Sequence, residues 1–286
     1  MTAEQHLKSG DLGATLAALQ AEVRARPSDP KLRIFLFQLL SVLGDWKRAV
    51  AQLKLAAELD PGAELMAKTY REAIICEVYR GKVFAGEKAP LVLGEPEPWL
   101  AALIAAQEQA GQGHAAAAAD LRAQAFDAAP ASAGSADGQA FDWFADADMR
   151  LGPVLEVIVN GRYFWLPFAR IHRLEIEPPA DLRDAVWTAA TLSLRNGGTV
   201  PALIPTRYPG TLASGSDAEK LARATRWEEP APGLYQGLGQ RVFATEAADL
   251  PLWDLRLLEF TLSEAEAALL AAEDPVSGPT EGLRDG

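Results

Sequence analysis

Cysteine and histidine are scarce in this chain, and with them the patterns that most metal and redox sites require. The 286 residues include one cysteine, Cys76, and three histidines. A single cysteine cannot form an internal disulfide, and no Cys-x-x-Cys motif can exist. His6, His114 and His172 lie in distant segments of the chain. The sequence also lacks the HExxH and GxSxG motifs, so no catalytic motif supports an enzyme.

Long apolar runs are also missing. No stretch reaches the roughly 18 apolar residues that a membrane-spanning helix needs. The first residues, MTAEQHLKSGD, do not show the basic and then apolar regions of a secretory signal. We therefore expect a cytoplasmic protein without a membrane partner.

Positive charge is in deficit as well. The formal net charge is −12, and residues 131–286 hold 23 acidic and 13 basic side chains. Most of the negative charge therefore lies in the C-terminal part. Such a surface repels the phosphate backbone, which argues against a nucleic-acid partner.

What the sequence does contain is a repeat in its first half. Gly10 to Pro27 reads GDLGATLAALQAEVRARP, and 34 residues later Gly44 to Pro61 reads GDWKRAVAQLKLAAELDP. This interval is the tetratricopeptide period, in which each unit is a helix–turn–helix. The glycine suits the left-handed end of one helix, the aspartate caps the next helix, and the proline ends it. A third, alanine-rich copy runs from Gly113 to Pro130, so we expect about seven helices over residues 3–128.

Stacked helical repeats leave a concave face that commonly binds a peptide or a helix. Aligning the copies on the usual repeat places certain first-helix positions on that face. The sequence therefore predicts partner-binding residues at Lys31, Ile34, Gln38, Leu103 and Gln107. The alternative for each is packing against a neighbouring helix.

The second half changes to a strand pattern. Residues 129–140, APASAGSADGQA, read as a linker of small and turn-forming residues. After the linker, PVLEVIVNGRYFWLP forms a hairpin around Asn160-Gly161, and a second hairpin turns at Asn196-Gly197. At least six short strands favour a small barrel or a strongly bent sheet over residues 141–273. Residues 274–286 read as a disordered tail. The predicted fold is α+β, with tetratricopeptide-like helices over residues 1–128 and then a β-rich, barrel-like domain.

A competing hypothesis places a metal or anion site, or an enzyme active site, in the β half. Asp142, Asp146 and Asp148 could bind Ca²⁺ or Mg²⁺ through carboxylate oxygens, although the spacing does not match an EF-hand loop. Capping of the turn that enters the first strand is the other interpretation of these aspartates. Arg207, in PTRYPGT, could hold an anion or pair with a carboxylate. The sequence predicts no cofactor.

Three segments together resemble a known family. FDWFADADMRLGPVLEVIVNGRYFWLPFARI, IEPPADLRDAVW and NGGTVPALIPTRYPGT, which follow the helical repeats, resemble the ImpE family, also called TagJ. The resemblance implies a non-enzymatic accessory protein of a bacterial type VI secretion system. It also implies association with the small subunit of the contractile sheath (TssB or VipA type) and a link to the ClpV-type ATPase. It assigns no catalytic residue.

Overall fold

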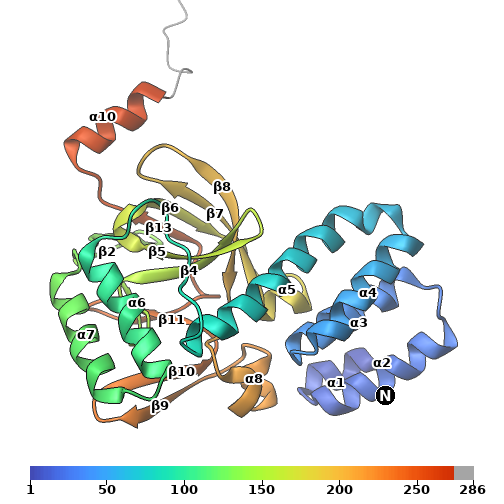
Figure 1. The fold of residues 1–286 in the computed structure, drawn as a ribbon. Helices are drawn as coiled ribbons and strands as arrows, with labels where there is room; N and C mark the ends of the chain where they lie inside the picture. Colours follow the sequence, from blue (N-terminus) through green and yellow to red (C-terminus); the bar gives the residue numbers. More distant parts are fainter. Residues whose placement is uncertain (274–286) are drawn as a thin grey trace, which may run out of the picture.

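The computed structural model describes residues 1–273 and combines helices in the N-terminal part with sheets in the C-terminal part (Figure 1). The tail expected at residues 274–286 lies outside the described residues. The α-helices before the first strand are α1 (Ala3–Ser9), α2 (Leu12–Ala25), α3 (Pro30–Val42), α4 (Trp46–Leu59), α5 (Glu64–Phe84), α6 (Pro98–Gly111) and α7 (Ala115–Ala128). No helix within residues 1–273 is long and apolar enough to cross a bilayer.

The helix boundaries follow the predicted punctuation. Gly10 and Gly44 have φ of 83° and 75°, values that glycine adopts without a steric penalty. Asp11 and Asp45 accept hydrogen bonds from backbone N–H groups in the first turns of α2 and α4. A regular tetratricopeptide array is not confirmed, because α5 has 21 residues and packs against a strand of the β half instead of beginning another matched pair.

The main sheet has eight strands in the order β2-β1-β13-β6-β7-β8-β4-β5, and its paired strands are antiparallel. Its strands are β1 (Gly134–Ala136), β2 (Gln139–Phe141), β4 (Val154–Val159), β5 (Arg162–Pro167), β6 (Ile171–Ile176), β7 (Trp187–Leu194), β8 (Thr199–Pro205) and β13 (Leu257–Phe260). Among the described residues this order has two ends, β2 and β5, so closure into a barrel is not confirmed.

Smaller elements flank this sheet. The pair β9 (Thr225–Ala231) and β10 (Leu234–Gly239) forms a separate hairpin. A third sheet joins β3 (Ala145–Asp146), β11 (Val242–Ala244) and β12 (Asp249–Pro251). The short helices are α8 (Thr211–Ser214), α9 (Asp217–Lys220) and α10 (Glu264–Glu273), and the 3-10 turns are η1 (Pro61–Ala63), η2 (Phe168–Arg170) and η3 (Leu182–Ala185).

The two predicted hairpins are confirmed. Asn160 and Gly161 join β4 to β5 with φ of 50° and 68°, the positive pair that a type I′ turn requires. The β7–β8 hairpin turns at Asn196–Gly198, with Gly197 at φ 88°. These local signals were strong because the turn type and the flanking β-branched residues agree.

The linker predicted at residues 129–140 is wrong over its second half. β1 and β2 occupy that region and pair around Asp137-Gly138, both of which have positive φ. β1 also pairs with β13, near the other end of the chain. At Gly134 an added Cβ would lie 2.1 Å from the Glu259 carbonyl oxygen, so only glycine permits this approach. Strands of only three residues are too short to show an apolar alternation, which is why the sequence pattern did not reveal them.

One hydrophobic core runs through both halves of the chain. It includes Phe37 of α3 and Tyr70 of α5 together with Trp165 and Trp187 of the main sheet. A second core lies within the β half, where the rings of Phe141, Phe144, Phe168, Phe243 and Phe260 pack together. The helical half and the β half are therefore joined by packed side chains as well as by the chain itself.

Candidate functional site

Residues 182–187 of the β half pack against the helices that were expected to form an open groove. The Trp187 ring lies 5.6 Å from that of Tyr70 and 6.1 Å from that of Trp46. The Arg183 guanidinium lies 4.8 Å from the centre of the Tyr70 ring. η3, which precedes Trp187, packs on α3. This side of the helical layer is therefore covered by the chain itself.

The five residues predicted to bind a partner do not share one surface. Lys31 is exposed and Ile34 is half-buried, both on α3. Gln38 is buried on the same helix. On α6, Leu103 is 1% exposed, and the buried Gln107 donates a hydrogen bond to the Phe84 carbonyl oxygen at 2.9 Å. Figure 1 places α3 and α6 on opposite sides of the molecule, with α5 running between them. Contact of these residues with a partner stays a prediction, and only Lys31 and Ile34 are accessible for it.

The aspartates of FDWFADADMR make protein contacts. Asp146 accepts hydrogen bonds from the Asp148 N–H and the Tyr208 hydroxyl, and Asp148 accepts from the Arg150 N–H. These are the capping contacts that the sequence offered as an alternative to metal binding. Asp142 is exposed. Residues 1–273 contain no group of three or more His, Cys, Asp and Glu side chains placed to hold a metal ion.

Arg207 also binds protein atoms. Its guanidinium donates to the carbonyl oxygens of Val42 at 2.8 Å and of Lys220 at 2.7 Å. Burial lowers the pKa of Arg207 to about 10, and the nearby Glu77 carboxylate opposes this change. The side chain thus ties the end of α3 to the β half, which leaves it poorly placed to receive an external anion.

A buried ion cluster connects α5 to the sheets. The Arg80 guanidinium donates to both oxygens of Glu156 on β4, at 2.6 and 2.8 Å. Arg241 donates to Glu156 and to Asp146. Glu156, Asp146 and Arg241 are all at least 97% buried. Two guanidiniums therefore face the carboxylates of Glu156 and Asp146, and the Glu77 carboxylate lies 3.4 Å from Arg80 as a third acidic group.

The two carboxylates of this cluster have opposite pKa shifts. Burial alone would raise the pKa of Glu156, but the charges of Arg80 and Arg241 outweigh it and bring this pKa down to about 2. Burial raises the pKa of Asp146 to about 7, although Arg241 opposes the rise. Asp146 pairs with one guanidinium and Glu156 with two, which accounts for the difference. Every charged member of the cluster is bonded to another protein group, so the cluster is built for stability.

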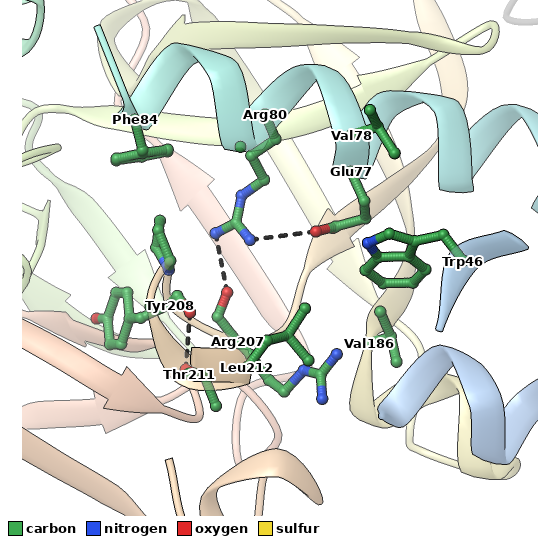
Figure 2. Close-up of a pocket in the computed structure, with 13 residues that line it drawn as sticks. Trp46, Glu77, Val78, Arg80, Phe84, Val186, Arg207, Tyr208, Thr211 and Leu212 are labelled. Carbon is green, nitrogen blue, oxygen red and sulfur yellow. Dashed lines mark hydrogen bonds and ion pairs between the residues drawn. The ribbon is translucent and has the colours of Figure 1, made fainter. Parts of the chain in front are cut away.

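A cleft of about 390 Å³, here called the central cleft, opens beside this cluster (Figure 2). Its walls come from α4, α5 and the loop that follows β8. Apolar groups dominate: Trp46, Val78, Phe84 and Leu212 line it. The Glu77 carboxylate lies between Arg80 and Trp46 in Figure 2. One of its oxygens is 3.4 Å from Arg80, and the other has no hydrogen-bond partner among the described residues.

The outer face of α5 leads into the central cleft. This face consists of side chains at heptad spacing, namely Lys68, Arg71, Ile75, Val78 and Lys82. Ile75 is 57% exposed and Val78 is 47% exposed, although both are large apolar residues. Apolar residues at this spacing on a helix surface are typical of a seam that packs against another helix. This second apolar face was visible in the sequence, because the apolar residues of α5 fall on two sides of the helix. The β half covers only one of these sides.

Comparison with known proteins gives one consistent result. The ImpE family, described as "ImpE protein", matches residues 138–259. A type VI secretion system accessory component, TagJ of Pseudomonas aeruginosa, is 51% identical over 267 residues, which cover 93% of each chain. The crystal structure of protein VPA1032 from Vibrio parahaemolyticus superimposes with a TM-score of 0.84 at 28% identity, covering 92% of this chain and 98% of that one.

Proposed function

This chain belongs to the ImpE family, and from that premise we propose that it is a non-enzymatic adaptor of a type VI secretion system that binds the small subunit of the contractile sheath. The adaptor role comes from the TagJ relative, whose name describes an accessory component. The observation that carries the binding mode is the outer face of α5, which exposes Ile75 and Val78 beside the central cleft.

The chemistry of this face defines the partner segment. An amphipathic helix lying along α5 would place apolar residues, at three- and four-residue spacing, against Ile75 and Val78. Lys68, Arg71 and Lys82 flank these positions, so acidic residues on the partner helix would be favoured. One anchor side chain would enter the central cleft, where Trp46 and Phe84 supply apolar contact and the Glu77 oxygen accepts a hydrogen bond. The proposal thus moves the binding face from α3 and α6 to α5.

Replacing Ile75 by glutamate is expected to weaken binding of the purified sheath small subunit by about thirtyfold, which corresponds to about 2 kcal/mol for a buried anchor. A carboxylate at this position would be desolvated in the interface and would repel the acidic residues expected on the partner helix. The measurement is isothermal titration calorimetry with wild type and variant at equal helical content by circular dichroism.

Two matched variants locate the face. Leu269 on α10 is 48% exposed, so Leu269→Glu makes the same kind of change at a distant position and should leave the affinity unchanged. Ile34→Glu tests the face predicted from the repeat alignment. A loss of binding with Ile34→Glu and wild-type affinity with Ile75→Glu would return the site to α3. Wild-type affinity for both variants would show that the sheath subunit binds neither to α3 at Ile34 nor to α5 at Ile75.

The link to the ClpV-type ATPase is part of the same proposal. A bridging adaptor should let the sheath small subunit and the ATPase sediment together only when it is present. In this assay Ile75→Glu should release the sheath subunit and leave the ATPase contact intact. Equal co-sedimentation without the adaptor would argue against bridging.

A further inference from the structure

A second cleft lies between α7 and the β9–β10 hairpin. It has a volume of about 400 Å³. In Figure 1, α7 begins beside this hairpin at the lower edge of the molecule. The helix side presents alanines of α7 together with Arg122 and Phe126, and the hairpin side presents Pro230, Pro232 and Leu234. We call it the α7 cleft.

One charged side chain, Arg122, lines the α7 cleft. Arg122 is 7% exposed. No described residue accepts a hydrogen bond from its guanidinium or forms an ion pair with it within 4.0 Å, although a guanidinium carries five N–H donors. Burial lowers the pKa of Arg122, and the charge of Asp148 opposes this effect. The side chain is therefore mostly buried, and its guanidinium faces the cleft without a hydrogen-bond partner among the described residues.

The nearby Asp148 does not satisfy Arg122, because its carboxylate is already fully used. One oxygen accepts from the backbone N–H and the Nε of Arg150, both at 2.9 Å. The other accepts from Arg150 Nη2 at 2.5 Å and from the Gly237 N–H at 2.9 Å. Four donors occupy the four acceptor positions of a carboxylate. An acceptor for Arg122 therefore comes from solvent or from a group bound in the cleft.

The remaining surface of the cleft restricts what that acceptor can be. No acidic side chain lines it, and its lining is otherwise apolar or neutral: alanines of α7, Phe126, Met149 and Gln236 besides the hairpin residues. A fully hydrated inorganic anion would leave these apolar walls without contacts. A carboxylate carried between apolar side chains would satisfy both parts of the surface at once.

We propose that the α7 cleft binds a glutamate or aspartate flanked by apolar residues in a segment of a partner protein, with the Arg122 guanidinium bonded to the carboxylate. A guanidinium donates two parallel hydrogen bonds to one carboxylate, so the contact fixes orientation as well as charge. The alanines of α7 let the backbone of the bound segment approach the helix closely. This site is separate from the one on α5 and does not depend on it.

The chain offers a direct probe of this cleft, because Met149 lines it and the other two methionines, Met1 and Met66, do not. Protein carrying ¹³C-labelled methionine methyl groups would be titrated with acetyl-Leu-Glu-Leu-amide and with its Gln counterpart. The glutamate peptide should shift the Met149 signal with a Kd of about 1 mM, and the glutamine peptide should bind at least about tenfold more weakly. Shifts of Met66 without Met149 would place the binding elsewhere and overturn the proposal.

Three variants complete the test. Arg122→Leu should bind both peptides equally weakly, and its melting temperature should equal or exceed that of wild type, because an unpaired buried charge is removed. Arg122→Lys should keep part of the preference for glutamate. Arg24→Leu changes an exposed arginine of α2 and should behave as wild type. Equal affinity of the wild-type protein for the two peptides would overturn the proposal.

Two further outcomes also count against it. A clear drop in the melting temperature of Arg122→Leu would show that the arginine supports the fold. A Met149 shift of the same size with sodium acetate alone would show that the cleft takes small anions and does not require a protein segment. If Arg122→Leu fails to fold, Arg122→Lys and wild type are compared with the same two peptides. A smaller preference for the glutamate peptide in Arg122→Lys then supports the proposal, and an equal preference contradicts it.

Discussion

Replacing Arg241 by methionine is expected to lower the free energy of unfolding by about 4 kcal/mol, a large share of the roughly 5–15 kcal/mol that stabilises an ordinary domain. Arg241 is fully buried and bonds to Asp146, Glu156 and the Pro205 carbonyl oxygen. After the change Glu156 still has Arg80, but Asp146 loses the one ion-pair partner that it has within residues 1–273. The dominant cost is therefore that of a buried carboxylate left without a cation.

Urea unfolding followed by far-ultraviolet circular dichroism measures this loss. Arg26→Met is the matched control, because Arg26 pairs with Glu22 and Asp29 at the surface, where its side chain is 60% exposed. Surface pairs of this kind contribute about 0–1 kcal/mol. Similar losses for the two variants would mean that the buried cluster contributes no more than a surface pair.

Changing Glu156 to glutamine is expected to cost about 3 kcal/mol at neutral pH and almost nothing near pH 2. The pKa of Glu156 is about 2 in the folded protein, against an ordinary value of 4.5. A carboxyl whose folded pKa is depressed adds stability above its unfolded pKa, and that stability is lost as the pH falls from about 4.5 toward the folded value. Glutamine cannot ionise, so the variant lacks this contribution at every pH.

The measurement is the difference in unfolding free energy between wild type and Glu156→Gln at a series of pH values. Asp146, whose pKa is raised to about 7, acts in the opposite sense, because its contribution is present at low pH and is lost as the pH rises toward 7. Subtracting the unfolding free energy of the variant from that of wild type at each pH cancels the contribution of Asp146, since Asp146 is present in both proteins. A difference that stayed constant between pH 7 and about pH 3 would contradict the assignment of the acid response to Glu156.

Local signals in the sequence predicted much of the fold. The Gly–Asp openings at Gly10 and Gly44 marked helix ends, and Asn160-Gly161 marked a hairpin, because each depends on a few neighbouring residues. β1 and β2 escaped prediction because their stability comes from β13, more than a hundred residues away in the chain. The spacing of apolar residues within a segment does not show that the segment pairs with a strand so distant in the sequence.

The candidate site was harder to predict for a related reason. Gln38, Leu103 and Gln107 were assigned to a groove by their place in the repeat. The repeat does not show that residues 182–187 return to cover α3 and α5, or that α6 packs against α7 and the end of α5. Arg80, Glu156 and Arg241 come from segments that no motif connects, so their association is visible only in the fold. The exposed apolar residues of α5 could have been predicted from the sequence. A helix with apolar residues on two faces is expected to pack against other elements on both faces.

The cover formed by residues 182–187 has a consequence for how the protein is synthesised. The helices leave the ribosome first, and about a hundred more residues must follow before Trp187 can reach Tyr70. At about 5–20 residues per second, the uncovered face of α3 and α5 waits for roughly 5–20 seconds. A ribosome-bound chain stalled near residue 150 should therefore crosslink to a nascent-chain chaperone through Tyr70, whereas a chain stalled near residue 273 should not. Equal crosslinking at both lengths would mean that the early helices protect themselves before their cover arrives.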